Sequence, residues 1–136
     1  MALKICDLYK NPEYEEEILS EVAAYKALEV LQGVCIPHFK IAGYDGGLFS
    51  IVMEVAGSPI VVGKLGCQER LKIANSLLLI HQHGIIHNDI RVDNVLVCYD
   101  KGFQVLFIDF ARSRRTDDEL ELRREMVKLE SLLHIG

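Results

Sequence analysis

The sequence lacks any long hydrophobic run. Its longest apolar stretches, such as residues 73–80, are interrupted by Asn75 and Ser76 and are too short to span a bilayer. Residues 1–7 also lack the extended apolar segment of a signal peptide. These absences argue against secretion and membrane insertion. They favour an intracellular, cytoplasmic protein, with a nuclear location left open.

An excess of basic residues is also missing. The chain has 15 Lys and Arg against 20 Asp and Glu, which gives a formal net charge of −5. A protein that binds nucleic acid through its phosphates needs a basic surface. The charge balance therefore argues against nucleic acid as a partner.

The cysteines form no C-x-x-C pair. Cys6, Cys35, Cys67 and Cys98 are spread along the whole chain, so neither a zinc ribbon nor a redox motif is present. Without an export signal, we expect these residues to be reduced and to lie in the core rather than in disulfides.

What is present is an ordinary globular composition, with 50% hydrophobic and 26% charged residues among 136. A chain of this length can bury one modest core, so we expect a single domain over residues 1–136.

Hydrophobic periodicity predicts a mixed α+β chain. Asn11 and Pro12 are typical of a helix start, and the helix is expected to run from Pro12 to Leu31, with Gly33 beyond its end. Leu122, Met126, Leu129 and Leu133 recur at helical spacing and predict a last helix that begins near Asp117. The remaining expected elements are a strand at 2–6, a β-hairpin of 39–44 and 48–55, a helix at 68–82, and short strands at 85–87, 95–97 and 104–108.

A polar loop between two apolar segments carries the chemistry. Residues 87–94 read His-Asn-Asp-Ile-Arg-Val-Asp-Asn, and Asp109-Phe110 follows Asn94 by fifteen residues. Together they resemble the catalytic loop and metal-binding segment of the protein-kinase-like superfamily, H-x-D-x-x-x-x-N followed by D-F-G.

The resemblance continues upstream of this loop. Residues 2–4, Ala-Leu-Lys, match the last three positions of V-A-I-K, which places Lys4 at the lysine that contacts the ATP phosphates. Glu21 is similar in position to the partner of that lysine, with Glu17 as an alternative. Residues 53–56 resemble the segment that joins the two lobes and receives adenine, which assigns Glu54 and Ala56 to the nucleotide site.

This resemblance implies a two-lobed protein-kinase-like fold, with a partial N-lobe and hinge at 1–56 and a minimal C-lobe at 57–136. It implies ATP and Mg²⁺ as cofactors. The acceptor would be a protein Ser/Thr or a small-molecule hydroxyl.

The resemblance also implies roles for individual residues. Asp89 would accept or orient the proton of the attacking hydroxyl, and Arg91 would neutralise charge on the transferred phosphate. Asn94 and Asp109 offer the hard oxygen ligands that Mg²⁺ prefers. Lys4, held by Glu21, would contact the phosphates.

The sequence departs from the superfamily pattern in three places. Only three residues precede Lys4, so we expect no Gly-rich loop strands, Ala111 replaces the Gly of D-F-G, and no A-P-E motif follows.

These departures leave alternatives to an active phosphotransferase. One is a catalytically impaired, pseudokinase-like binding module. Another is a small atypical kinase that acts as an ATPase accessory factor, like those of the tRNA-modification machinery. The incomplete sheet is expected to leave an open edge near Lys4, where a protein partner or a second copy could pair.

Overall fold

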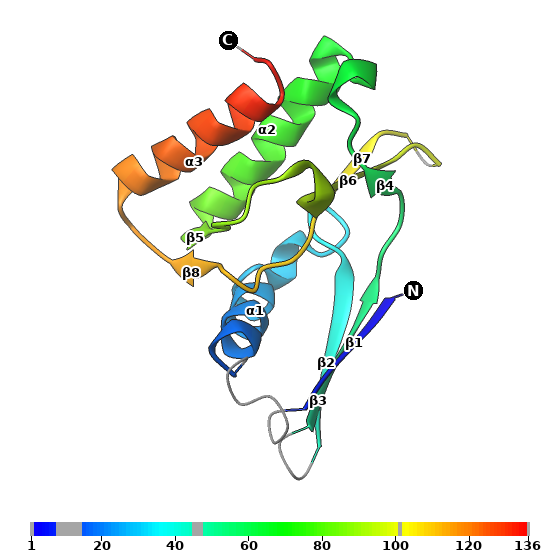
Figure 1. Ribbon diagram of the computed structural model, residues 1–136, viewed down its shortest axis with the longest axis vertical. Helices are drawn as coiled ribbons and strands as arrows, with labels where there is room; N and C mark the ends of the chain where they lie inside the picture. Colours follow the sequence, from blue (N-terminus) through cyan, green and yellow to red (C-terminus); the bar gives the residue numbers. More distant parts are fainter. Residues whose placement is uncertain (1, 8–14, 45–47, 101, 136) are drawn as a thin grey trace.

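The computed structural model describes residues 2–7, 15–44, 48–100 and 102–135. It has a mixed α+β architecture, as the sequence predicts (Figure 1). The first part of the chain contains β1 (Ala2–Asp7), α1 (Glu15–Ala27), the 3₁₀-helix η2 (Glu29–Leu31), β2 (His38–Tyr44) and β3 (Leu48–Glu54). The second part contains β4 (Ser58–Pro59), η3 (Val62–Lys64), α2 (Cys67–Gln82), β5 (Ile85–Ile86), η4 (Val92–Asn94), β6 (Val95–Cys98), β7 (Gln104–Phe107), β8 (Arg114–Arg115) and α3 (Glu119–Leu132).

The first sheet is antiparallel, with strand order β1-β3-β2. The pairing of β2 with β3 confirms the predicted hairpin, and Lys4 on β1 lies opposite Ile51 on β3. Within the described residues β1 occupies one edge of this sheet. Helix α1 lies beside the sheet, on the side toward the rest of the chain (Figure 1).

The first helix is shorter than the sequence predicts. Its expected start at Asn11 and Pro12 lies outside the described residues, and the α-helix ends at Ala27 instead of Leu31. Beyond Ala27 the backbone tightens, and the Leu31 N–H donates to the Leu28 carbonyl 2.8 Å away. The tighter turn keeps both Leu28 and Leu31 buried. This packing constraint outweighs the helical spacing of the apolar residues.

Gly33 ends this segment, as predicted. Its backbone has φ +75°, a conformation that favours glycine. A Cβ atom there would approach the His38 ring to 2.6 Å. The reversal brings the Cys35 carbonyl to the Phe107 N–H, 2.8 Å away, and so joins the end of η2 to β7.

The second half of the chain pairs short strands around two helices. One small sheet has the order β4-β6-β7 and another pairs β5 with β8. Helices α2 and α3 lie side by side at the far end from the first sheet (Figure 1). The predicted helix at 68–82 is confirmed as α2. None of the helices in the described residues is long and apolar enough to cross a membrane.

Asp118 caps the last helix, close to its predicted start. Its carboxylate accepts hydrogen bonds from the backbone N–H groups of Leu120 and Glu121, at 2.9 and 3.4 Å. A side chain that accepts from the first free N–H groups stabilises a helix start by about 0.5–2 kcal/mol.

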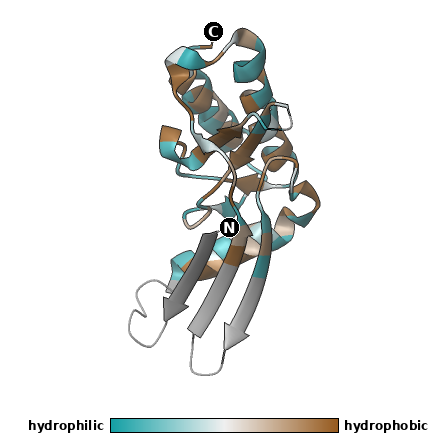
Figure 2. Cartoon of the chain, turned by 90° about the vertical axis from the view of Figure 1, so that its right-hand side faces the viewer, coloured by the Kyte–Doolittle hydropathy of each residue, from teal (hydrophilic) through white to brown (hydrophobic). Residues whose placement is uncertain are grey.

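One continuous hydrophobic core runs from α1 to α3. Hydrophobic segments are concentrated where α2 and α3 meet the short strands, with hydrophilic residues toward the outer turns (Figure 2). The largest fully buried side chains of the core are Tyr25, Leu28, Ile36, Ile73, Leu77, Ile80, Ile85, Phe107, Phe110, Leu129 and Leu133.

The cysteine expectation is only partly confirmed. Cys35, Cys67 and Cys98 are free, and Cys35 is buried in the core. Cys67 is exposed because it begins α2 on the outer surface, so the prediction of a core position is wrong for it. The side chain of Cys6 lies outside the described residues.

Two adjacent leucines on α2 test the core assignment. Leu77 is fully buried and Leu78 is 46% exposed. We expect Leu77→Ala to lower the free energy of unfolding by about 2–5 kcal/mol, because it leaves a cavity. Leu78→Ala should change it by about 0.5 kcal/mol or less. Urea denaturation of both variants measures the difference, and equal losses would contradict the described packing.

Candidate active site

The polar loop of residues 87–94 connects β5 to β6 and closes on itself through Asn94. The side-chain Nδ2 of Asn94 donates to the Asp89 carbonyl at 2.8 Å and to Asp89 Oδ2 at 3.1 Å. Asn94 is almost fully buried, so its position is fixed by these bonds. The sequence prediction that Asp89 and Asn94 lie together is therefore met by the geometry.

Arg91 contacts the same carboxylate. Its Nε lies 3.2 Å from Asp89 Oδ1, and its side chain is 57% exposed while that of Asp89 is 16% exposed. Both carboxylate oxygens of Asp89 therefore have a partner. Because the Arg91 side chain is largely in water, this ion pair is weak and can open at little cost.

Asp109 lies next to this loop because β7 ends beside Asn94. The Ile108 N–H donates to the Asn94 carbonyl at 3.0 Å, which places the next residue, Asp109, at the loop. Asp109 has φ +62° and Asn88 has φ +67°. Residues other than glycine rarely adopt this conformation, and such strain concentrates at functional sites.

A row of aromatic rings holds these segments together. Ring centroids lie 4.9 Å apart for Tyr25 and Phe39, 5.3 Å for Tyr25 and Phe110, and 4.7 Å for Phe110 and His87. Phe107 continues the row, 6.3 Å from His87. The row joins β2 and α1 to the Asp109 segment and to the polar loop.

His87 is held in its neutral form. Its Nε2 lies 2.8 Å from the Ile108 carbonyl and must donate, because a carbonyl only accepts. Its Nδ1 accepts from the Asp89 N–H at 3.1 Å. Burial lowers the pKa of His87, against the opposing effects of the Ile108 carbonyl and of the Glu125, Asp109 and Asp89 charges.

Glu21 faces the same region from α1. It is 1% exposed, whereas Glu17 is exposed, so only Glu21 lies inside the structure. Burial raises the pKa of Tyr25, and the negative charges of Glu21 and Asp109 raise it further. The charges of both carboxylates therefore act on the Tyr25 hydroxyl.

The Tyr25 hydroxyl itself is unusual. Within the described residues it has no hydrogen-bond partner of good geometry, although the Asp109 backbone is close enough to have a small lowering effect on its pKa. A buried hydroxyl without a partner costs free energy. Tyr25 follows Glu21 by four residues, on the same face of α1.

A buried carboxylate fixes the polar loop from its other side. Glu125 on α3 is 6% exposed. Its Oε1 accepts from the His87 N–H at 3.0 Å and lies 2.8 Å from His81 Nε2, and its Oε2 accepts from the Asn88 N–H at 2.7 Å. Burial alone would raise the pKa of Glu125, but the bonds from His81, His87 and Asn88 outweigh it and hold the pKa below its usual value.

Sequence reasoning missed Tyr25, His81 and Glu125 as parts of the site. The hydrophobic spacing of the last helix did point to one of these residues. Glu125 lies one turn after Leu122 and one turn before Leu129, so it is a charged residue on the apolar face of the last helix. A charge at such a position needs a partner, which the sequence alone does not identify.

The side-chain oxygens near the loop are suitable ligands for a magnesium ion that is bound together with phosphate. The side-chain nitrogen of Asn94 donates to Asp89, so the side-chain oxygen of Asn94 is left as a possible metal ligand. Asp109 adds a carboxylate. Mg²⁺ is commonly bound by one or two protein oxygens together with water and substrate phosphates. The described residues contain no group of three His, Cys, Asp or Glu that could hold a metal ion by themselves.

The remaining predicted nucleotide residues are not all brought to this point. Glu54 ends β3, and both Glu54 and Ala56 line a hollow of about 400 Å³ with residues of 33–38 and 98–106. Among the described residues, neither Asp109 nor Glu21 lines that hollow. The backbone of Lys4 lies in β1, and its side chain is outside the described residues.

Comparison with known proteins gives a partial match. No family model matches the chain. The chain is 31% identical to "Probable serine/threonine-protein kinase fnkE" of Dictyostelium discoideum over an alignment of 98 residues that covers 64% of this chain. The match spans 7% of that relative's length. It indicates a kinase-like relationship and nothing finer.

The contacts of Glu125 predict a specific loss in Glu125→Gln. An amide nitrogen cannot accept, so one of the loop N–H groups loses its partner. We expect the free energy of unfolding to fall by about 1–3 kcal/mol, the cost of leaving a buried donor unpaired. Urea denaturation, with amide hydrogen exchange at His87 and Asn88, measures the stability and the opening of the loop.

Glu121→Gln is the matched control. Glu121 lies one turn earlier on α3 and pairs with Arg114 at the surface. Exchange at His87 and Asn88 should keep its wild-type rate in this variant. Faster exchange there in both variants would contradict a specific role of Glu125.

The neutral state of His87 predicts a pH dependence. Folding lowers the pKa of His87, so below the unfolded pKa of about 6.5 the unfolded state binds a proton more readily than the folded state. The protein therefore keeps its full stability above that pH and loses stability as the pH falls below it. We expect wild type to lose stability between pH 7.5 and 5.5, by at most about 1.4 kcal/mol per pH unit from this group. His87→Gln, which can still donate and accept, should lose less. Denaturation at several pH values tests this, and parallel curves would contradict it.

Proposed function

We propose that this chain is a kinase-like phosphotransferase domain that moves the γ-phosphoryl group of ATP to a hydroxyl, with Mg²⁺. One observation carries the proposal. Asn94 joins Asp89 to Asp109, because its side chain binds Asp89 and its carbonyl binds the residue before Asp109. A proton acceptor and two oxygen ligands at one point are what phosphoryl transfer requires.

Each residue has a role in this proposal. Asp89 takes the proton of the acceptor hydroxyl. The oxygen of that hydroxyl attacks the γ-phosphorus, and the bond from the γ-phosphorus to the bridging oxygen breaks, which releases ADP. Arg91, already beside Asp89, neutralises charge on the transferred group. Asn94 and Asp109 would hold Mg²⁺, which supplies charge neutralisation on the phosphates when bound.

The proposed fold is two-lobed, with residues 1–56 as a partial N-lobe and hinge and 57–136 as a minimal C-lobe. Two features support this fold. The first sheet and α1 precede the polar loop along the chain, and they lie at the opposite end of the molecule from α2 and α3 (Figure 1). The burial of Glu21, whose charge acts on the same Tyr25 hydroxyl as that of Asp109, supports a pairing with Lys4 on the phosphates. Adenine contact by Glu54 and Ala56 stays a prediction, as does pairing of another chain at the β1 edge.

The acceptor is proposed to be a serine or threonine hydroxyl of a protein, or a hydroxyl of a small molecule. The similarity to a protein named as a serine/threonine kinase favours a hydroxyl over other acceptors. The chain matches 7% of that relative.

A binding module without turnover is the second candidate, as a pseudokinase-like domain or an ATPase accessory factor. One observation favours it. Both oxygens of the Asp89 carboxylate are engaged, by Asn94 and by Arg91. These contacts crowd the carboxylate that would have to take the proton of an acceptor hydroxyl, although each oxygen keeps a second lone pair.

Calorimetric titration with ATP, with and without Mg²⁺, tests the proposal. We expect wild type to bind ATP more tightly with Mg²⁺ present. Asp109→Asn should weaken that binding by roughly tenfold, since it removes a charged ligand. Asp89→Asn should still bind and should lower the rate of phosphoryl transfer or ATP hydrolysis by roughly 10²–10⁴-fold.

Asp93→Asn is the matched control. Asp93 is an exposed aspartate of the same loop, in η4, and should behave like wild type. Mg²⁺-dependent binding with no turnover in wild type would support the binding module. Absence of binding at millimolar ATP, in protein shown to be folded, would refute both candidates that use nucleotide.

A further inference from the structure

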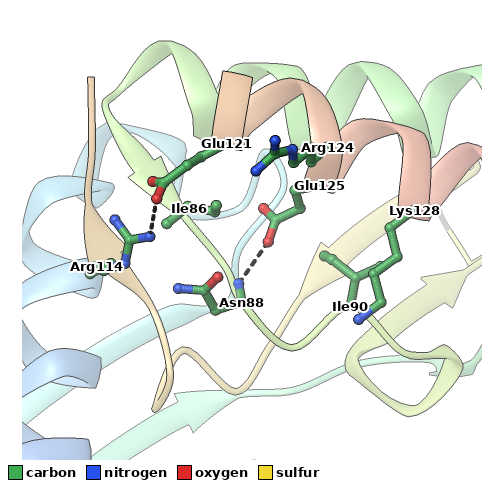
Figure 3. Close-up of a pocket in the computed structure, with 8 residues that line it drawn as sticks. All are labelled: Ile86, Asn88, Ile90, Arg114, Glu121, Arg124, Glu125 and Lys128. Carbon is green, nitrogen blue, oxygen red and sulfur yellow. Dashed lines mark hydrogen bonds and ion pairs between the residues drawn. The ribbon is translucent and has the colours of Figure 1, made fainter. Parts of the chain in front are cut away.

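A basic hollow borders the polar loop at Asn88 and Ile90. Its volume is about 280 Å³. Arg114 of β8, Arg124 and Lys128 of α3, and Asn88 of the loop surround it (Figure 3). The remaining lining residues are Ile86, Ile90, Glu121 and Glu125.

The two acidic residues of this hollow already have partners. Glu121 lies 2.7 Å from Arg114 Nη2, and its other oxygen accepts from the Thr116 hydroxyl at 3.0 Å. The Glu125 carboxylate is used by His81 and by the backbone of the loop, one contact of which is drawn in Figure 3. The Glu121 charge also acts on Arg124 at longer range, so it is shared between the two arginines.

Arg124 and Lys128 are the unpaired cations. Both are exposed, and among the described residues neither has a hydrogen bond or a close ion pair, although the charge of Arg124 interacts with that of Glu121 at longer range. The Asn88 side chain is also exposed, although its backbone N–H is bound by Glu125. The hollow therefore presents two cations without a close partner among the described residues, and an amide that can still donate.

Residues 112–128 carry six basic residues against five acidic ones, so this segment has a formal charge of +1 while the whole chain has −5. The basic residues are Arg112, Arg114, Arg115, Arg123, Arg124 and Lys128. A local basic cluster on an acidic protein attracts small anions selectively to that point.

A second hollow of about 710 Å³ adjoins the first and shares Ile90, Arg124 and Lys128 with it. Its other lining residues are mainly apolar, with Ser131 and His134 at its polar positions. The two hollows together offer a site for an anionic group and space beside it for the body of a small molecule.

We propose that this basic hollow binds a phosphate monoester carried by the acceptor, so that the substrate is a small phosphorylated molecule with a free hydroxyl. This inference rests on the proposed function. Asn88 and Ile90 line the hollow and flank Asp89 directly, and neighbouring Cα atoms are about 3.8 Å apart. An acceptor anchored by its phosphate there would lie beside the backbone segment that carries Asp89, so its hydroxyl has only the width of the loop to cross.

The free cations explain why a phosphate fits better than a neutral group. A phosphate monoester carries up to two negative charges and three acceptor oxygens. Arg124 and Lys128 supply two positive charges one helical turn apart, and the Asn88 amide supplies a neutral donor. Charge-assisted hydrogen bonds of this kind are about twice as strong as neutral ones.

Binding without ATP tests the hollow separately from phosphoryl transfer. O-phosphoserine, serine and inorganic phosphate are titrated into the full chain, and the amide shifts of Asn88 and Arg124 are followed by NMR. The hydroxyl of O-phosphoserine is esterified, so it probes binding of a phosphate monoester and not transfer to it. We expect saturable binding of O-phosphoserine, no binding of serine, and weaker binding of inorganic phosphate. Binding should weaken as the salt concentration rises.

The double variant Arg124→Gln, Lys128→Gln removes both free cations. We expect it to weaken O-phosphoserine binding by roughly tenfold or more. Arg123→Gln is the matched control, because Arg123 is the preceding residue of α3 and lines a different hollow, with Leu78 and Met126. Because all three side chains are exposed, the variants should fold, which their urea midpoints check.

The possible results separate the two proposals. No saturable binding of O-phosphoserine, or equal binding by wild type and the double variant, would overturn the inference. Inorganic phosphate that binds as tightly as O-phosphoserine would overturn the acceptor assignment, because the site would then hold a free anion. O-phosphoserine binding in a protein that binds no ATP would support the hollow and refute the proposed function.

Discussion

The arrangement of the candidate site depends on the packing of Phe110 between two other rings. Tyr25 contacts it from α1 and His87 contacts it from the polar loop. Phe110 also directly follows Asp109, so one buried side chain fixes the position of a carboxylate, a helix and a loop. Aromatic rings bury large areas and prefer defined relative orientations, which makes such a contact both strong and specific. Through this contact the charges of both Glu21 and Asp109 act on the Tyr25 hydroxyl.

The polar loop is held from two sides, and the two sides have different chemistry. On one side Asn94 and Arg91 contact the Asp89 carboxylate. On the other, the Glu125 carboxylate binds consecutive backbone N–H groups of His87 and Asn88. The left-handed backbone of Asn88 lies between these two contacts. A buried carboxylate with several donors rigidifies the backbone it binds, so the strain at Asn88 is supported by α3.

Much of the candidate site follows from local sequence. Asp89 and Asn94 are five residues apart in one loop, so any closed form of that loop brings them together. The helix at 68–82 and the hairpin of β2 and β3 were predicted because their patterns are local. The first helix was predicted too long, because the tighter turn after Ala27 depends on burial of Leu28 and Leu31 against distant segments. Strand β8 was missed because its pairing with β5 joins segments about thirty residues apart.

The sequence by itself determined the α+β class, most element positions and the grouping of Asp89 with Asn94. Hydrophobic spacing and loop closure act over a few residues, and a sequence displays them directly. Tertiary structure alone decided that Glu21 is buried while Glu17 is exposed, and that Glu125 binds the polar loop. It also decided that Arg114 and Lys128 meet across one hollow. These outcomes depend on which helix faces pack together, and that choice is made by the whole core at once.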